Sequence, residues 1–180
     1  DPSKIALYGI SLGGYFSLRA AAHEPRIRAL ISNSPITDIY KYMTGVAGEE
    51  TMNSPQDIGL DYIDEIPAEY LSKGKKLQIL NIILRYGERS MFAAFERMKE
   101  FTVGEAIKNI RAPFLGMVSQ GEGLGAMGQA EEAVKGVSGP SSLRVFTKDE
   151  GADSHCQLTN LPLSNAVLLD WLDEVFGVRS

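Results

Sequence analysis

The stretch Gly9-Ile10-Ser11-Leu12-Gly13 decides how this chain folds, because it places a serine in a G-x-S-x-G pattern between two different periodicities. The apolar run over residues 5–8 predicts a buried strand before it, and residues 15–22 have the spacing of a helix after it. A strand, a sharp turn and a helix with serine at the apex form a nucleophile elbow, where glycines let the strand and helix approach closely. We expect three glycines to permit that approach: Gly9, Gly13 and Gly14.

An elbow of this kind predicts acyl-transfer chemistry. The turn presents the Ser11 hydroxyl to solvent, and it directs the first N–H groups of the helix, beginning with Leu12, at any oxyanion that forms beside the serine. Ser11 is therefore the candidate nucleophile, and the backbone amide of Leu12 is the candidate oxyanion donor.

Composition narrows the classes of protein and partner. The chain has 180 residues, 44% of them hydrophobic and 23% charged, which is enough for one core and too short for two full domains. Its net charge of −5, with a basic cluster only at residues 73–76, argues against a nucleic-acid partner. The longest apolar stretches, such as residues 77–84, are interrupted by polar side chains and fall far short of the roughly 20 residues that span a bilayer, so we expect no membrane partner.

Cys156 is the single cysteine of the chain. It excludes an intrachain disulfide and a cysteine-rich metal site, and it is compatible with a cytoplasmic location, which we expect.

The order of the remaining elements predicts an α/β fold with an insertion. A strand over residues 27–32 follows the elbow helix, and this strand–helix–strand unit implies a parallel pair. The sheet pattern resumes with strands at 114–119 and 143–146, separated by a helix at 129–137 and closed by an amphipathic helix at 162–176. We therefore assign residues 1–35 and 103–180 to the core and residues 36–102 to a helical insertion.

Local signals refine this division. Within the insertion we expect a helix start at Ser54-Pro55, helical spacing through residues 77–84 and a helix over residues 91–101. Thr102 and Glu105 have the spacing of a capping box at the start of a short helix. The glycine-rich segment 121–128 lacks the phosphate-loop pattern and is interpreted as a flexible loop.

A serine nucleophile needs a base, and only two histidines are available. His23 lies about 12 residues along the elbow helix, roughly 18 Å from Ser11 at ~1.5 Å per residue, and is too distant. His155 lies in a polar loop after the last strand, at the carboxyl edge where α/β sheets place their sites, and is the candidate base. We do not expect Cys156 to act as the nucleophile, because we expect the neighbouring His155 to point elsewhere, and we expect Cys156 to pack behind the base.

The sequence alone does not identify which carboxylate orients the base. The chain order serine, acid, histidine admits Glu122, just past the third strand, and Asp38, just past the second. Asp149 and Asp153 are so near His155 in sequence that we expect them to face away from it.

With these residues in place, the chain resembles the α/β-hydrolase superfamily over nearly its whole length. It is similar in particular to the cap-bearing group that contains the fungal yellowish-green pigment hydrolases, which shorten polyketides, and 2,6-dihydroxypseudooxynicotine hydrolase. The stretches that carry this closer resemblance are residues 9–15, residues 34–38 and, most specifically, residues 150–157.

The resemblance implies a mechanism and a set of roles. In this superfamily a G-x-x-D pattern ends with the acid, and Ser119-Gln120-Gly121-Glu122 matches its register, which implies Glu122 as the acid. The insertion would be a cap that forms the acyl pocket, and Asp38 would handle substrate or water. The implied reaction is attack by Ser11 on a ketone carbonyl of a small β-diketone-like or acyl substrate, without a metal or cofactor.

The same machinery cleaves other bonds, so two further interpretations stay open: a carboxylesterase or acyl-peptide hydrolase with the same triad, and a non-catalytic binding member of the superfamily.

The elbow strand also comes within the first few residues, although an elbow normally lies in the middle of its sheet. The chain looks like the C-terminal portion of the fold, so we expect a missing N-terminal portion as its partner, to supply a second oxyanion amide. We expect the 180-residue chain alone to be inactive, and a homodimer is an open alternative.

Overall fold

The computed structural model describes residues 1–53 and 58–178. They form two compact units: unit 1 is Asp1–Asp38 together with Val103–Ser180, and unit 2 is Ile39–Thr102. The expected helix start at Ser54-Pro55 lies outside the described residues.

Unit 1 is built on a four-stranded parallel sheet in the order β1 (Ala6–Ile10), β2 (Ala29–Asn33), β3 (Phe114–Ser119) and β4 (Ser141–Phe146). Every residue of β2 and β3 is buried, as expected for parallel strands covered on both faces. Because all four strands run in one direction, their carboxyl ends meet at a single edge of the sheet. The α/β fold expected from the sequence is thereby confirmed.

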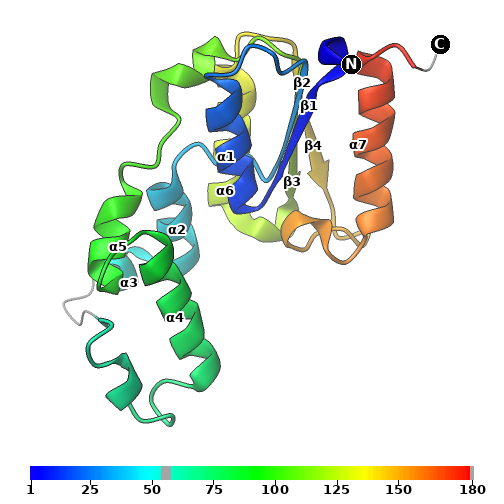
Figure 1. The fold of residues 1–180 in the computed structure, drawn as a ribbon. Helices are drawn as coiled ribbons and strands as arrows, with labels where there is room; N and C mark the ends of the chain where they lie inside the picture. Colours follow the sequence, from blue (N-terminus) through cyan, green and yellow to red (C-terminus); the bar gives the residue numbers. More distant parts are fainter. Residues whose placement is uncertain (54–57, 179–180) are drawn as a thin grey trace. The chain divides into compact units, whose positions relative to one another are not determined.

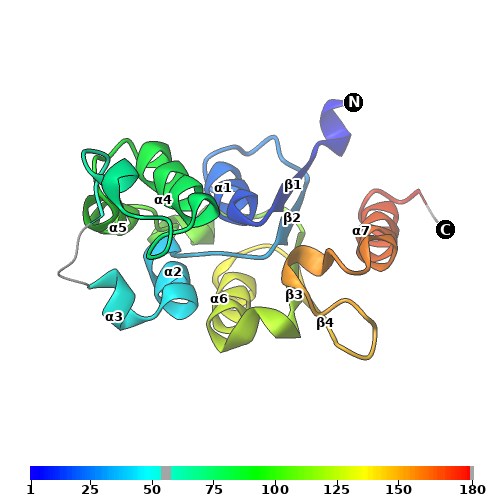
Figure 2. The ribbon, with the colours of Figure 1, turned by 90° about the horizontal axis from the view of Figure 1, so that it is seen from below.

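Helices cover both faces of this sheet. α1 (Leu12–Ala21) and α6 (Gly123–Gly136) lie on one face, and α7 (Leu161–Val175) lies on the other (Figures 1 and 2). The short 3₁₀ helices of unit 1 are η1 (Pro2–Lys4), η3 (Gly104–Asn109), η4 (Gln120–Glu122) and η5 (His155–Gln157). The last two lie between the strand ends and the helices α6 and α7, and they carry Glu122 and His155.

The core beneath α7 consists of apolar strand residues, one loop alanine and one buried helical leucine. Its buried members are Ile31, Leu115, Met117, Phe146, Ala152 and Leu168. Part of the predicted apolar stripe of the closing helix packs against them, namely Val167, Trp171 and Leu172. This face of the sheet is therefore closed by α7.

The prediction of a flexible loop over residues 121–128 was wrong, because α6 begins at Gly123. Burial of Ala126, Ala130 and Ala133 on this helix outweighs the poor helix propensity of its glycines. Gly121 is required by a close approach, since a Cβ there would lie 2.3 Å from the Asp153 carbonyl oxygen.

The predicted capping box at Thr102 was also wrong. The N-cap of η3 is Val103, which makes no side-chain capping bond. A capping box does form between Ser119 and Glu122 at η4, in the turn that follows β3.

Unit 2 is helical, with α2 (Ile39–Ala47), α3 (Glu49–Met52), η2 (Ile63–Glu65), α4 (Lys73–Arg85) and α5 (Met91–Met98). Serine hydroxyls cap its two C-terminal helices, α4 and α5: Ser72 accepts the N–H of Lys75, and Ser90 accepts the N–H of Ala93. Throughout the described ranges, no helix combines the length and apolar character needed to cross a membrane.

Candidate active site

The G-x-S-x-G turn connects β1 to α1 with Ser11 in a strained conformation. Ser11 has φ 57°, which few non-glycine residues adopt. Its N–H donates to the Asn33 carbonyl oxygen at 2.5 Å, and its own carbonyl accepts the N–H of Gly14 at 2.7 Å. These bonds fix the turn against the end of β2, and Leu12 becomes the first residue of α1.

Two of the three expected glycines are needed for close packing of this turn. A Cβ at Gly9 would lie 2.0 Å from the Gly13 carbonyl oxygen, and one at Gly14 would lie 1.9 Å from the Ser34 carbonyl oxygen. A Cβ at Gly13 would meet no other described atom within 4 Å, so the expectation for Gly13 was wrong. Its position faces open space instead of a neighbouring element.

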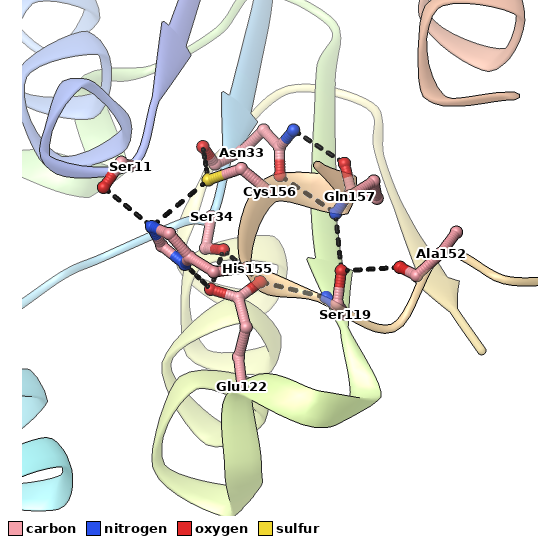
Figure 3. Close-up of polar contacts among 9 residues, drawn as sticks. All are labelled: Ser11, Asn33, Ser34, Ser119, Glu122, Ala152, His155, Cys156 and Gln157. Atoms are coloured by element: carbon pink, nitrogen blue, oxygen red, sulfur yellow. Dashed lines mark hydrogen bonds and ion pairs between the residues drawn. The ribbon is translucent and has the colours of Figure 1, made fainter. Parts of the chain in front are cut away.

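Ser11, His155 and Glu122 come together at the carboxyl edge of the sheet, although they are distant in sequence (Figure 3). His155 Nε2 lies 2.8 Å from Ser11 Oγ, and His155 Nδ1 lies 2.5 Å from Glu122 Oε2. The serine comes from the turn after β1, the carboxylate from η4 after β3, and the imidazole from η5. The three groups form one continuous hydrogen-bonded chain.

Glu122 is held in place from several directions. Its side chain is only 2% exposed. The Ser34 hydroxyl lies 2.6 and 2.7 Å from its two oxygens, and the Ser119 N–H donates to Oε1 at 3.1 Å. Burial raises the pKa of this carboxyl, but the bonds from His155, Ser34 and Ser119 outweigh burial and leave the pKa below its ordinary value. The group is therefore an ionised acceptor aimed at Nδ1.

Cys156 contacts the same imidazole nitrogen as the serine. Its Sγ lies 3.4 Å from His155 Nε2 and 3.4 Å from the Asn33 carbonyl oxygen. The expectation that His155 points away from this cysteine was wrong, because Cys156 adopts a left-handed conformation (φ 52°) that turns its side chain back toward the ring. The bond with Cys156, and after it the bond with Glu122, raises the pKa of His155 to about 10, against burial, which lowers it.

The other candidates lie apart from this chain of contacts. Nδ1 of His155 is met by Glu122, whereas Asp38 is fixed through its backbone, whose N–H and carbonyl both bond the side chain of Gln129. Asp153 presents its carbonyl oxygen to the N–H of Gly121. His23 follows α1 and is exposed.

Four polar residues around the triad were missed from the sequence: Asn33, Ser34, Ser119 and Gln157. All are at most 1% exposed, and all belong to one buried network (Figure 3). The available signal was the polar end of two otherwise apolar strands, together with a glutamine two residues after the candidate base. Among the described residues, no group of three or more His, Cys, Asp and Glu side chains is placed to hold a metal ion.

Comparisons with known proteins agree with this architecture. The model of the prolyl oligopeptidase family matches residues 1–81, which include the Ser11 turn. Hydrolase ORFZ of Pyricularia oryzae is 24% identical to this chain over 99% of it and 44% of the relative. The chain thus spans less than half the length of that relative.

Solved structures share the fold. The α/β hydrolase GrgF from Penicillium sp. sh18 has a TM-score of 0.54 at 16% identity, covering 97% of this chain and 64% of its own. AbyA5 has a TM-score of 0.62 at 16% identity, covering 98% of this chain and 44% of its own. The arrangement of strands and helices in unit 1 is that of the α/β-hydrolase fold.

Proposed function

We propose that this chain, which has the α/β-hydrolase fold, carries the catalytic groups of a serine hydrolase. Ser11 is the nucleophile, His155 the general base and Glu122 the acid that orients it. The observation that carries this proposal is the continuous series Ser11 Oγ, His155 Nε2, His155 Nδ1 and Glu122 Oε2, with separations of 2.8 Å and 2.5 Å.

The proposed reaction proceeds through an acyl-enzyme. Ser11 Oγ attacks a carbonyl carbon while its proton passes to His155 Nε2, and the Leu12 N–H at the start of α1 stabilises the oxyanion. Glu122 keeps Nδ1 protonated, so that Nε2 is free to accept the proton. When the tetrahedral intermediate collapses, the leaving group takes that proton, and a water activated by His155 then hydrolyses the acyl-serine.

We propose a carbon–carbon bond of a β-dicarbonyl or polyketide-like compound as the bond that is cleaved. In such a substrate the departing carbon is stabilised as an enolate by the neighbouring carbonyl and is then protonated by the imidazolium of His155. The support is the likeness of residues 9–15, 34–38 and 150–157 to the polyketide-shortening group. Unit 2 would provide the acyl pocket, and Asp38 would handle substrate or water.

A comparison of substrates tests this proposal. We expect kcat/KM for β-diketones to exceed that for p-nitrophenyl esters of matched acyl length by more than about tenfold, the discrimination that a few pocket contacts supply. The measurement is steady-state kinetics on both panels, with Ser11→Ala as the blank. A preference for the esters would contradict carbon–carbon cleavage and leave the serine hydrolase assignment intact.

A second candidate is hydrolysis of a peptide or ester bond by the same triad. It is favoured by the match of residues 1–81 to the prolyl oligopeptidase family, because that segment contains the nucleophile. Cleavage of peptide substrates, with no turnover of β-diketones, would establish it. If Ser11 fails to react with a fluorophosphonate in the intact protein, the chain is instead a non-catalytic binding member of the superfamily.

We further propose that this sheet is completed by strands from outside the chain. In the described part, β1 pairs on one side with β2, and Ile10 at its end is 52% exposed. The companion strands would supply the second oxyanion N–H, whose loss typically costs ~10²–10³-fold in turnover. Activity should therefore be assayed with the whole protein that contains this chain.

Cys156→Ala is expected to shift the rising limb of the pH profile to lower pH. The base must be neutral to accept the serine proton, so activity rises as pH increases through the pKa of His155, which is raised to about 10. The sulfur contributes most to that rise, and alanine removes it without changing the Cβ or the backbone. The measurement is kcat/KM against pH, and the ionisable groups facing the ring are Cys156 from η5 and Glu122 from η4.

Cys156→Ser is the matched control, because its hydroxyl keeps a hydrogen-bonding group beside Nε2 and should give an intermediate profile. Identical profiles for the wild-type protein and Cys156→Ala would show that the sulfur has no influence on the base.

A further inference from the structure

The loop that carries His155 contains two consecutive strained residues. Cys156 and Gln157 have φ values of 52° and 54°, in the left-handed region that non-glycine residues rarely occupy. Such conformations persist only where the surrounding structure holds them. Because they directly follow the candidate base, whatever holds them also sets the position of the imidazole.

The side chain of Gln157 stabilises these two strained backbone conformations. It is completely buried, and its amide is bonded at both ends. Oε1 accepts from Asn33 Nδ2 at 2.7 Å, while Nε2 donates to Asn33 Oδ1 at 3.2 Å and to Ser119 Oγ at 2.8 Å. The Gln157 N–H also bonds the Ser154 carbonyl, which closes the backbone turn around His155.

The two partners of this amide terminate β2 and β3, and each is bonded directly to another member of the triad. Asn33 accepts the Ser11 N–H through its carbonyl at 2.5 Å. Ser119 donates its N–H to Glu122 Oε1 at 3.1 Å and forms the capping box of η4 with that residue. One buried amide thus joins the nucleophile turn, the acid turn and the histidine loop (Figure 3).

We propose that Gln157 is a positioning residue of the hydrolase: its amide sets where His155 Nε2 lies relative to Ser11 and where Nδ1 lies relative to Glu122. Gln157 touches none of the reacting atoms and acts through Asn33 and Ser119. This inference rests on the proposed function. The proposed role also accounts for serine at position 119 of the turn that carries Glu122. The Ser119 hydroxyl accepts the hydrogen bond from Gln157 Nε2, which connects this turn to the loop that carries His155.

Gln157→Met is the test variant, because methionine has a similar side-chain length and leaves the backbone conformation to be held as before. It removes every hydrogen bond made by the side-chain amide of Gln157. A displacement of the imidazole by about 1 Å is expected to lower kcat about 10²-fold with KM nearly unchanged. The rate of fluorophosphonate labelling of Ser11, measured per folded molecule, should fall in parallel. In a crystal structure of the variant, the separation between Nε2 and Ser11 Oγ should exceed the 2.8 Å of the present structure.

Ser119→Ala removes one of these bonds and is the variant to measure if Gln157→Met does not fold. The matched control is Ser164→Ala. Ser164 is a comparably buried serine on α7 whose hydroxyl donates to the Leu161 carbonyl, so this substitution should leave the labelling rate unchanged. Because Ser119 and Gln157 act as a unit, the double variant should lose little more activity than Gln157→Met alone.

The outcomes separate the two proposals. If the folded Gln157→Met variant keeps a wild-type labelling rate and a wild-type Nε2-to-Oγ separation, the amide merely stabilises the fold and the positioning role is wrong. If the wild-type protein itself is not labelled, the serine hydrolase proposal fails, whereas the crystallographic separation still decides whether Gln157 places the imidazole.

Discussion

Ser11→Ala is expected to lower kcat/KM by about 10⁶-fold, the scale of loss seen when a triad nucleophile is removed. The hydroxyl that attacks the carbonyl is gone, and His155 Nε2 loses the partner that lies 2.8 Å away in the structure. The alanine keeps the turn intact, since the strained backbone is held by the bonds of the Ser11 N–H and carbonyl to Asn33 and Gly14. The measurements are steady-state kinetics and mass spectrometry after fluorophosphonate treatment.

Ser138→Ala is the matched control for this variant, because Ser138 is an exposed serine whose hydroxyl bonds the Lys108 carbonyl outside the site. It should keep both full activity and stoichiometric labelling. Because triad residues act as a unit, Ser11→Ala combined with His155→Ala should be no less active than either single variant. Turnover that survives Ser11→Ala would place the nucleophile elsewhere.

Glu122→Gln is expected to lower kcat by about 10⁴-fold, the loss that accompanies the corresponding change in a serine–histidine–acid triad. An amide in this buried place carries no charge to stabilise the imidazolium, and it allows the tautomer with the proton on the wrong nitrogen. The pKa of Glu122 lies below its ordinary value, so the carboxylate that the variant removes is ionised throughout the neutral range. The measurement is kcat at the pH optimum of each variant, together with its melting temperature.

Asp38→Asn distinguishes the two acids that the chain order allows. Glu122 meets Nδ1 of His155 at 2.5 Å, whereas the backbone of Asp38 is anchored by Gln129. We therefore expect Asp38→Asn to cost far less in kcat than Glu122→Gln toward an activated ester, whose leaving group needs little assistance. The reverse order of losses would make Asp38 the acid of the triad.

The sequence by itself determined the elements whose signals are local. The G-x-S-x-G stretch after an apolar run specified the strand, turn and helix around Ser11. The run at 114–119 specified a strand whose residues are all buried, and the strand predicted at 143–146 lies within β4, where only Phe146 is buried. Elimination between two histidines pointed to His155 because helix geometry alone makes His23 too distant. These inferences succeed because backbone sterics and burial act over a few neighbouring residues.

Tertiary structure alone decided the features that depend on distant partners. The glycines of 123–128 lie in α6 because the alanines of that helix are buried, and Gly13 faces open space while Gly9 and Gly14 are tightly packed. The left-handed conformations of Cys156 and Gln157 bring the thiol to the imidazole and the amide to Asn33, 124 residues away. Local sequence carries no record of such contacts, because a buried polar group is satisfied by whichever strand end the fold places beside it.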